Sequence, residues 1–108
     1  QSRVLHFILL RTLEVPVYQK DIEKEFDIRK STATEILKLM EKNGFIFREC
    51  SKEDGRMKEI IPTEKSLAMQ KEIVENIRSI ETKLREGIPP EDYQTCIDVL
   101  KKMIENLV

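Results

Sequence analysis

The sequence contains no tryptophan and few aromatic residues of any kind. Aromatic residues make up 6% of its 108 residues, whereas charged residues make up 36%. This composition is typical of a helix-rich protein with long exposed faces rather than of a β-sandwich or a β-barrel. A chain of this length supports one hydrophobic core, so we expect a single domain or one domain with an oligomerisation extension.

Cysteine and histidine are also scarce. The two cysteines, Cys50 and Cys96, cannot build a disulfide framework, and no second Cys or His stands at metal-ligand spacing. The single histidine, His6, lies in an apolar run, and we interpret it as a structural residue rather than a ligand. Because a nucleophile–base pair and a phosphate-binding loop are missing as well, the sequence predicts no enzyme, no metal site and no cofactor.

Long apolar runs are absent. No run approaches the ~20 residues that a membrane-spanning helix needs. No secretory signal is visible either, so we expect a cytoplasmic protein without a membrane partner.

Neither sign of charge dominates the chain, but the charged residues are unevenly distributed along it. The formal net charge is −1, yet residues 29–58 carry eight Lys/Arg against five Asp/Glu, which leaves −4 for the remainder. Seven charges crowd into residues 49–59, around Gly55. A basic centre with acidic flanks favours a localised anion-binding surface over a nucleic-acid coat that covers the whole chain.

The first 44 residues predict three helices. A dense apolar run predicts a helix over 2–14, which Pro16 ends because proline lacks an amide donor and restricts its predecessor. Apolar residues one turn apart predict a short helix over 18–26. Asp27 tolerates the left-handed backbone of a tight turn, and a third helix follows over 30–44, with Asn43-Gly44 as a left-handed stop.

The remaining residues predict a β-hairpin and two longer helices. Aromatic and β-branched residues over 45–50 and 58–63 predict two strands, joined by the charged segment around Gly55. Helices over 64–86 and 91–108 each carry an apolar stripe with a seven-residue repeat, typical of helices that pack along a seam. The seam is either internal core packing or a subunit interface. As an interface it comprises Ile73, Ile77, Ile80, Leu84, Tyr93, Ile97, Leu100, Ile104 and Leu107.

This order of elements predicts a fold that is mainly α with a small β-hairpin, a winged helix-turn-helix followed by C-terminal dimerisation helices. We expect a DNA-binding domain over 1–65 and a helical dimerisation region over 66–108 that continues from it. The tight turn sets the helix over 30–44 so that its polar face enters a major groove, which admits one helix. The candidate DNA-binding residues are Gln19, Lys30, Ser31, Thr32, Thr34, Lys38, Arg48, Lys52, Asp54, Arg56 and Lys58.

A second reading of the first turn of this helix stays open. Ser31 and Thr32 are also the residue types that cap helices, and Thr32-x-x-Glu35 fits a capping box. Capping and DNA contact are compatible.

Residues 4–68 resemble the DNA-binding core of the MarR (multiple-antibiotic-resistance regulator) family, and the resemblance extends more weakly through the last two helices. "KSTATEILKLMEKNGFIFRE" (30–49) is similar to the family's recognition helix running into "GL(V/I)xR". Asp54-Gly55-Arg56 matches the wing signature Asp-x-Arg. Pro62-Thr63-Glu64-Lys65-Ser66 stands where the family has Leu-Thr-x-x-Gly.

The resemblance implies a homodimer on a pseudo-palindromic operator, with Arg56 of each wing in the minor groove and Asp54 as its brace. It also implies repression of transcription and, for many members, release of DNA when a small anionic or aromatic effector binds between the DNA-binding and dimerisation parts.

Four positions depart from the family pattern. Glu35 stands where Arg is frequent, and Glu23 stands where a small Ala is usual in the short helix. Pro62 and Ser66 replace the usual Leu and Gly after the wing.

A different class of function is a winged-helix module that holds a protein partner and has lost DNA binding. Arg56 and the basic centre favour DNA. Glu35 and the acidic remainder favour the protein-interaction module.

Overall fold

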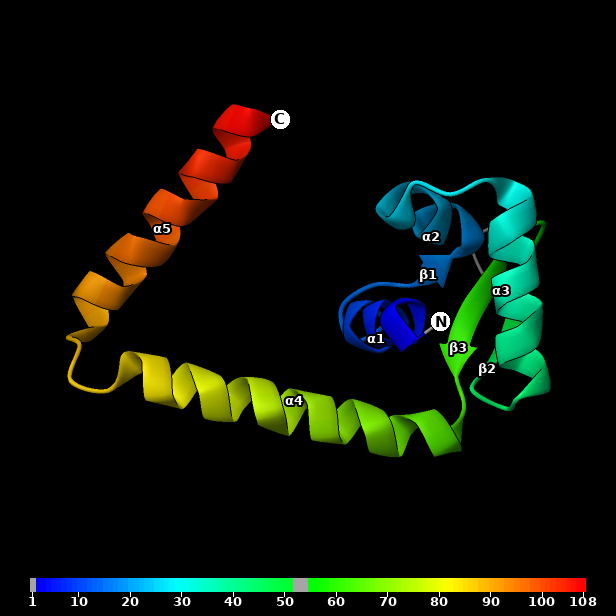
Figure 1. Ribbon diagram of the computed structural model, residues 1–108, viewed down its shortest axis with the longest axis horizontal. Coiled ribbons are helices and arrows are strands. Elements are labelled where there is room, and N and C mark those ends of the chain that lie inside the picture. The colour runs from blue at the N-terminus through cyan, green and yellow to red at the C-terminus, as the bar shows by residue number, and fades with distance from the viewer. Residues whose placement is uncertain (1, 52–54) are drawn as a thin grey trace. The chain divides into compact units, whose positions relative to one another are not determined.

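The computed structural model describes residues 2–51 and 55–108 and confirms the winged helix-turn-helix (Figure 1). The chain forms two compact units, residues 1–74 and 75–108, which meet within one long helix and are described separately here. The functional division after residue 65 stays a prediction. The elements in chain order are α1 (Ser2–Arg11), β1 (Val17–Tyr18), α2 (Gln19–Phe26), α3 (Lys30–Lys42), β2 (Ile46–Cys50), β3 (Lys58–Pro62), α4 (Glu64–Arg85) and α5 (Pro90–Leu107).

The described strands form one antiparallel sheet of three in the order β1-β3-β2, rather than a hairpin alone. Val17 pairs with Ile60 on one side of β3, and Arg48 pairs with Ile60 on the other. The two wing strands lie within one residue of their expected bounds. The sequence did not predict β1, because two residues are too few to show the alternation of a strand.

Helices α1, α2 and α3 lie beside this sheet (Figure 1), and the core of the first unit takes side chains from these helices and from the strands. Ile8 and Leu9 of α1, Ile22 of α2, Leu37 of α3 and Ile60 of β3 are all fully buried. A fully buried side chain of this size contributes about 1.5–3 kcal/mol relative to an exposed one. One small core therefore holds the three helices against the wing.

The first helix is shorter than the 2–14 expected from its apolar run. It ends at Arg11, and the chain continues in turns in which the Val15 amide donates to the Arg11 carbonyl at 3.1 Å. Leu13 is 54% exposed, so its place in a buried helical run was a wrong interpretation. The helix stops early because the chain must reach Val17 in an extended conformation to pair with β3.

The tight turn between α2 and α3 has the predicted geometry. Asp27 has φ 50° and ψ 53°, the left-handed conformation that a short polar side chain tolerates. The Ile28 amide donates to the Glu23 carbonyl at 3.1 Å, and the Ile28 side chain packs against the core. The turn thus closes the end of α2 and fixes where α3 begins.

Two hydroxyl groups tie the end of the wing to the end of α3. Thr63 Oγ1 donates to the Gly44 carbonyl at 2.6 Å, and Ser66 Oγ donates to the Phe45 carbonyl at 2.6 Å. Ser66 is fully buried, and this bond satisfies its hydroxyl. Serine is therefore well accommodated at the position where the resembled family has glycine.

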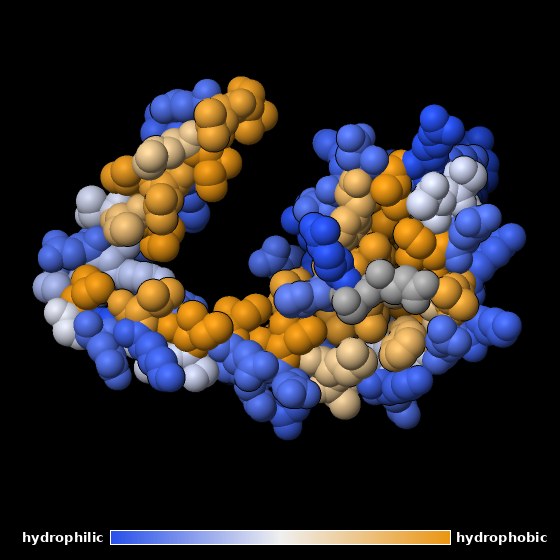
Figure 2. All heavy atoms as spheres, viewed as in Figure 1, coloured by the Kyte–Doolittle hydropathy of each residue, from blue (hydrophilic) through white to orange (hydrophobic). Residues whose placement is uncertain are grey.

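The second unit consists of the last part of α4, a turn and α5. Gly87 takes a positive φ of 72° in the turn, and Pro89 and Pro90 begin α5. The Arg85 guanidinium lies over the Tyr93 ring, 4.2 Å from its centroid, and so braces the turn. Figure 2 shows apolar residues gathered along α5 and the adjoining part of α4.

Replacement of Gly44 should be costly, as at the other glycine with a positive φ, Gly87. Its φ of +79° is strained for any residue with a Cβ, although a Cβ there would meet nothing within 4 Å. Gly44→Ala should therefore lower the free energy of unfolding by about 1 kcal/mol through backbone strain alone, measured by urea denaturation.

Gly55→Ala is the matched control. Gly55 also has open space around its Cβ position, but its φ lies outside the left-handed region, so stability should change little. Equal losses in the two variants would contradict this account.

Candidate nucleic-acid interface

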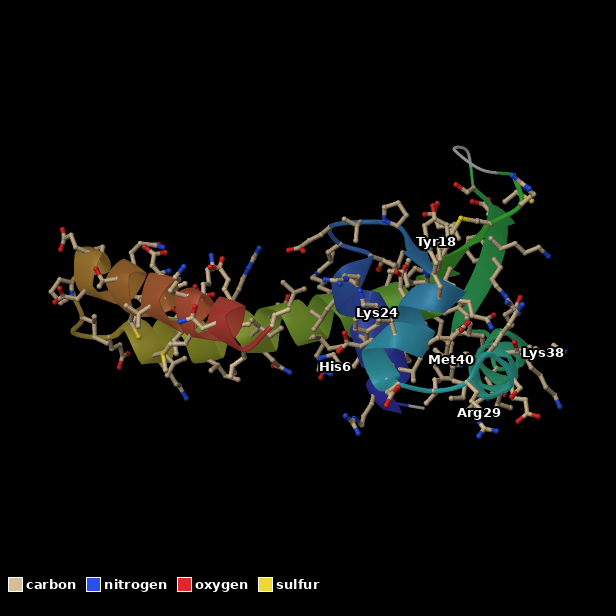
Figure 3. All side chains as sticks on the ribbon, turned by 90° about the horizontal axis from the view of Figure 1, so that it is seen from above. His6, Tyr18, Lys24, Arg29, Lys38 and Met40 are labelled. Carbon is tan, nitrogen blue, oxygen red and sulfur yellow. The ribbon has the colours of Figure 1, made fainter. Side chains whose placement is uncertain are left out.

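Helix α3 divides cleanly into a buried face and an exposed face. Ala33, Leu37 and Met40 are buried at spacings of four and three residues, which hold one side of the helix against the core. In Figure 3, Lys38 points away from the body of the first unit and Met40 toward it. The residues of α3 that are exposed are Lys30, Ser31, Thr32, Glu35, Lys38, Leu39 and Lys42.

The structure does not support Ser31 and Thr32 as caps of α3. The N-cap residue is Arg29, whose backbone is extended, and no side chain caps this end. Ser31 and Thr32 lie inside the first turn with exposed side chains. The first amides of a helix have no carbonyl partner within it, so this end of α3 is suited to an anionic group.

Thr34 takes part in a hydrogen-bond chain that joins α2 to α3. Its hydroxyl donates to the Lys30 carbonyl at 2.8 Å and accepts from Nε2 of Gln19 at 2.9 Å. Nε2 of Gln19 also donates to the Lys30 carbonyl at 3.2 Å. Two candidate DNA-contacting side chains therefore already bind each other and hold the first turn of α3 against the start of α2.

Arg48 extends the same chain into the wing. Its Nε and Nη2 donate to Oε1 of Glu41 at 3.0 and 2.7 Å, and its Nη1 donates to Oε1 of Gln19 at 3.4 Å. The Arg48 side chain is only 19% exposed. Strand β2 is thereby tied to both α2 and α3, and we refer to Gln19, Thr34, Glu41 and Arg48 as the polar network.

The root of the wing forms a shallow basic hollow of about 260 Å³. The amide of Ser51 donates to the Met57 carbonyl at 2.7 Å and extends the pairing of the two wing strands toward the tip. The predicted sites Lys52 and Asp54 lie outside the described residues. The hollow is lined by Tyr18, Gln19, Lys20, Arg48, Arg56, Met57 and Lys58.

Three exposed cations near this surface were not among the predicted contacts. Lys20 lines the hollow, Arg29 precedes α3, and Lys42 lies on the exposed face of α3. The position of Lys20 next to Gln19 was a usable signal, and the count of charges over 29–58 already included the other two. The candidate interface is therefore more basic than the predicted residues alone indicated.

Metal ligands, membrane-spanning helices and thiols are the other features of interest within residues 2–51 and 55–108. No group of three or more His, Cys, Asp or Glu is placed to hold a metal ion there. No helix in this part of the chain combines the length and apolarity needed to cross a membrane. Cys50 and Cys96 are exposed free thiols.

Comparisons with known proteins place this geometry among transcription regulators. A family model described as "MarR family" matches residues 1–57. The transcription regulator MarR from Oenococcus oeni PSU-1 is 32% identical, with a TM-score of 0.63, over 94% of this chain and 77% of that chain. A MarR-like transcriptional regulator from Thermotoga maritima is 27% identical, with a TM-score of 0.73, over 99% of this chain and 76% of that chain.

A third solved structure is that of Streptococcus pneumoniae FabT in complex with DNA. It is 21% identical, with a TM-score of 0.74, over 97% of this chain and 73% of that chain. At this identity the likeness shows a shared fold.

The polar network predicts a measurable role for Thr34 in the absence of DNA. Thr34→Val keeps the shape of the side chain and removes the hydroxyl that binds Gln19 and Lys30. The free energy of unfolding should fall by about 1 kcal/mol in urea denaturation.

Thr32→Val is the matched control on the same helix. Thr32 is exposed, and its hydroxyl has no hydrogen bond to any described residue, so stability should stay within about 0.5 kcal/mol of the wild type. If Thr34→Val proved as stable as Thr32→Val, the network would not contribute to stability.

Proposed function

The chain belongs to the MarR family, and from this premise we propose that it is a homodimeric transcription regulator that binds a pseudo-palindromic DNA operator. The observation that carries the proposal is the exposed polar and basic face of α3 beside a basic wing root. FabT, which shares the fold, was solved in complex with DNA.

In the proposed complex, α3 lies in a major groove and the wing reaches the adjacent minor groove. Lys30 and Lys38 contact phosphates, which position the protein without reading sequence. Ser31 and Thr32 are exposed near the free amides of the same turn and can reach phosphates or base edges. Arg56 is exposed at the wing and is proposed to enter the minor groove.

The second unit supports the proposed dimer. Its apolar side chains are largely uncovered within the unit, from Ile77 at 44% exposed to Leu107 at 89% exposed. An exposed apolar stripe of this kind marks an interaction surface. Ile73 is an exception among the predicted interface residues, because it already packs against the core of the first unit. The proposed interface comprises Ile77, Ile80, Leu84, Tyr93, Ile97, Leu100, Ile104 and Leu107.

We propose repression as the mode of regulation, with release of DNA on binding a small effector. A hollow of about 290 Å³ lies between α1 and the beginning of α4, within the first unit. Its size is near the lower end for small-molecule sites. His6, which the sequence led us to interpret as a structural residue, is exposed and lines this hollow. In this proposal Arg3 and His6 bind an anionic group of the effector, while Leu5, Leu9, Met69 and Ile73 supply apolar walls.

The exposed basic face also favours DNA over a protein partner as the ligand of the first unit. Affinity measured against salt concentration separates the two, because each neutralised phosphate releases counterions. A linear and steep fall of log affinity with log salt is expected for promoter DNA. Salt-insensitive or absent binding would favour the protein-interaction module.

Arg56→Ala should weaken operator binding by about tenfold or more and make the salt dependence shallower by about one charge. Fluorescence anisotropy with a selected operator at several salt concentrations would measure both effects. Lys71→Ala removes an exposed positive charge from α4 and is the control. Similar losses in both variants would mean that only overall charge matters.

Leu100→Glu should convert the dimer into a monomer, because it introduces a charge into the apolar stripe of α5. Analytical ultracentrifugation would show the change, and operator affinity should fall in parallel. Thr95→Glu adds the same charge about 140° around the helix from Leu100, at an exposed position, and should stay dimeric. A Leu100→Glu variant that remains dimeric would exclude this stripe as the interface.

A further inference from the structure

Glu35 lies in the middle of the exposed face of α3. Ser31 and Thr32 precede it by one turn, and Lys38 and Leu39 follow it by one turn, all of them exposed. Glu35 is also the single acidic residue among the exposed residues of α3. Any partner that binds this face of α3 therefore meets the Glu35 carboxylate near its centre.

The Glu35 carboxylate is not engaged elsewhere in the described part of the chain. Lys38 lies one turn away, but no ion pair or hydrogen bond joins the two residues or links Glu35 to another described residue. Glu41 on the same helix is different, because its carboxylate is bound by Arg48 at 2.7 Å. Its ion pair with Arg48 therefore gives Glu41 a structural role, whereas no structural role is visible for Glu35 among the described residues.

An unpaired carboxylate on a DNA-contacting face lowers affinity for every sequence, because it is repelled by the phosphates. Such a group is useful where it rejects wrong sequences more strongly than it weakens the right one. In the major groove, cytosine presents the N4 amino group, a donor that a carboxylate can accept. Guanine presents two acceptors there, and thymine presents an acceptor and a methyl group. Adenine also presents an amino donor, N6, but it stands beside the N7 acceptor, which repels a carboxylate more than the edge of cytosine does.

We propose that Glu35 is a specificity-determining residue that accepts a hydrogen bond from N4 of a cytosine in each half-site of the operator. The same carboxylate disfavours guanine and thymine at that position, because their groove edges place acceptors against it. This inference rests on the proposed function, and the dimer places the same cytosine in both half-sites. Ser31 and Thr32 cannot supply this discrimination, because a hydroxyl both donates and accepts.

Glu35→Gln tests the proposal directly. Selection from random duplexes would first give the operators of the wild type and of the variant. The wild type should prefer cytosine at one position of each half-site, and its replacement by guanine or thymine should cost about tenfold or more in anisotropy titrations, with a smaller loss for adenine. The variant should prefer adenine there, because a glutamine amide binds N6 and N7 of adenine.

A second readout distinguishes base reading from a structural role. Removal of the negative charge should raise the affinity of Glu35→Gln for unrelated duplex DNA, while its discrimination at the cytosine position falls. Thermal stability should not change, because the side chain is exposed and without a partner among the described residues. Glu25→Gln removes an exposed acid from α2 and should leave base preference unchanged at every position.

The outcomes separate this inference from the function on which it rests. Wild-type and Glu35→Gln proteins that bind operator DNA with the same base preference would overturn the role of Glu35 and leave the proposed function standing. A wild type that binds no duplex with a linear salt dependence would overturn both.

Discussion

Burial of Ile60 in the middle strand of the sheet is the constraint on which the first unit depends. Strand β3 pairs with β1 on one side and with β2 on the other, and Ile60 has Val17 and Arg48 as its cross-strand neighbours. Its side chain is fully buried in the core that also takes Ile22 and Leu37. The wing is therefore anchored in the core through Ile60. The same packing that holds α2 and α3 fixes the position of the wing root.

The polar network follows from this arrangement. Because β1 leads without a break into α2, Gln19 stands at the first position of that helix, within reach of both Thr34 and Arg48. The Gln19 side-chain amide thus joins Thr34 of α3 to Arg48 of β2, which lie 14 residues apart in the sequence. The polar network thereby joins α3 to the wing, while Ser31, Thr32 and Lys38 stay exposed on the outer face of α3.

Local sequence patterns predicted most of the helices and strands, and the features that they did not predict have physical causes. The start of α3, the wing strands and the left-handed Asp27 follow from local patterns, so local reasoning found them, although α3 ends at Lys42, two residues before the expected end. The end of α1 at Arg11 is set by the pairing of Val17 with a strand more than 40 residues away, which no local pattern contains. The same holds for Thr34, whose partner Gln19 belongs to another helix. Sequence reasoning recognised these residues as polar and exposed candidates, but it could not tell which of them bind one another.

The charge balance bears on how such a small protein could be selective. Residues 29–58 carry an excess of three positive charges, while residues 59–108 carry a net charge of −3. Salt screens charges beyond about 10 Å at 0.1 M, so the local excess governs contact with DNA, and a modest excess neutralises few phosphates. We therefore expect a low affinity for non-specific DNA. On the proposed DNA-binding face, the Glu35 carboxylate lowers it further, so the ratio of specific to non-specific binding can be high without tight binding. That ratio decides occupancy among competing genomic sites.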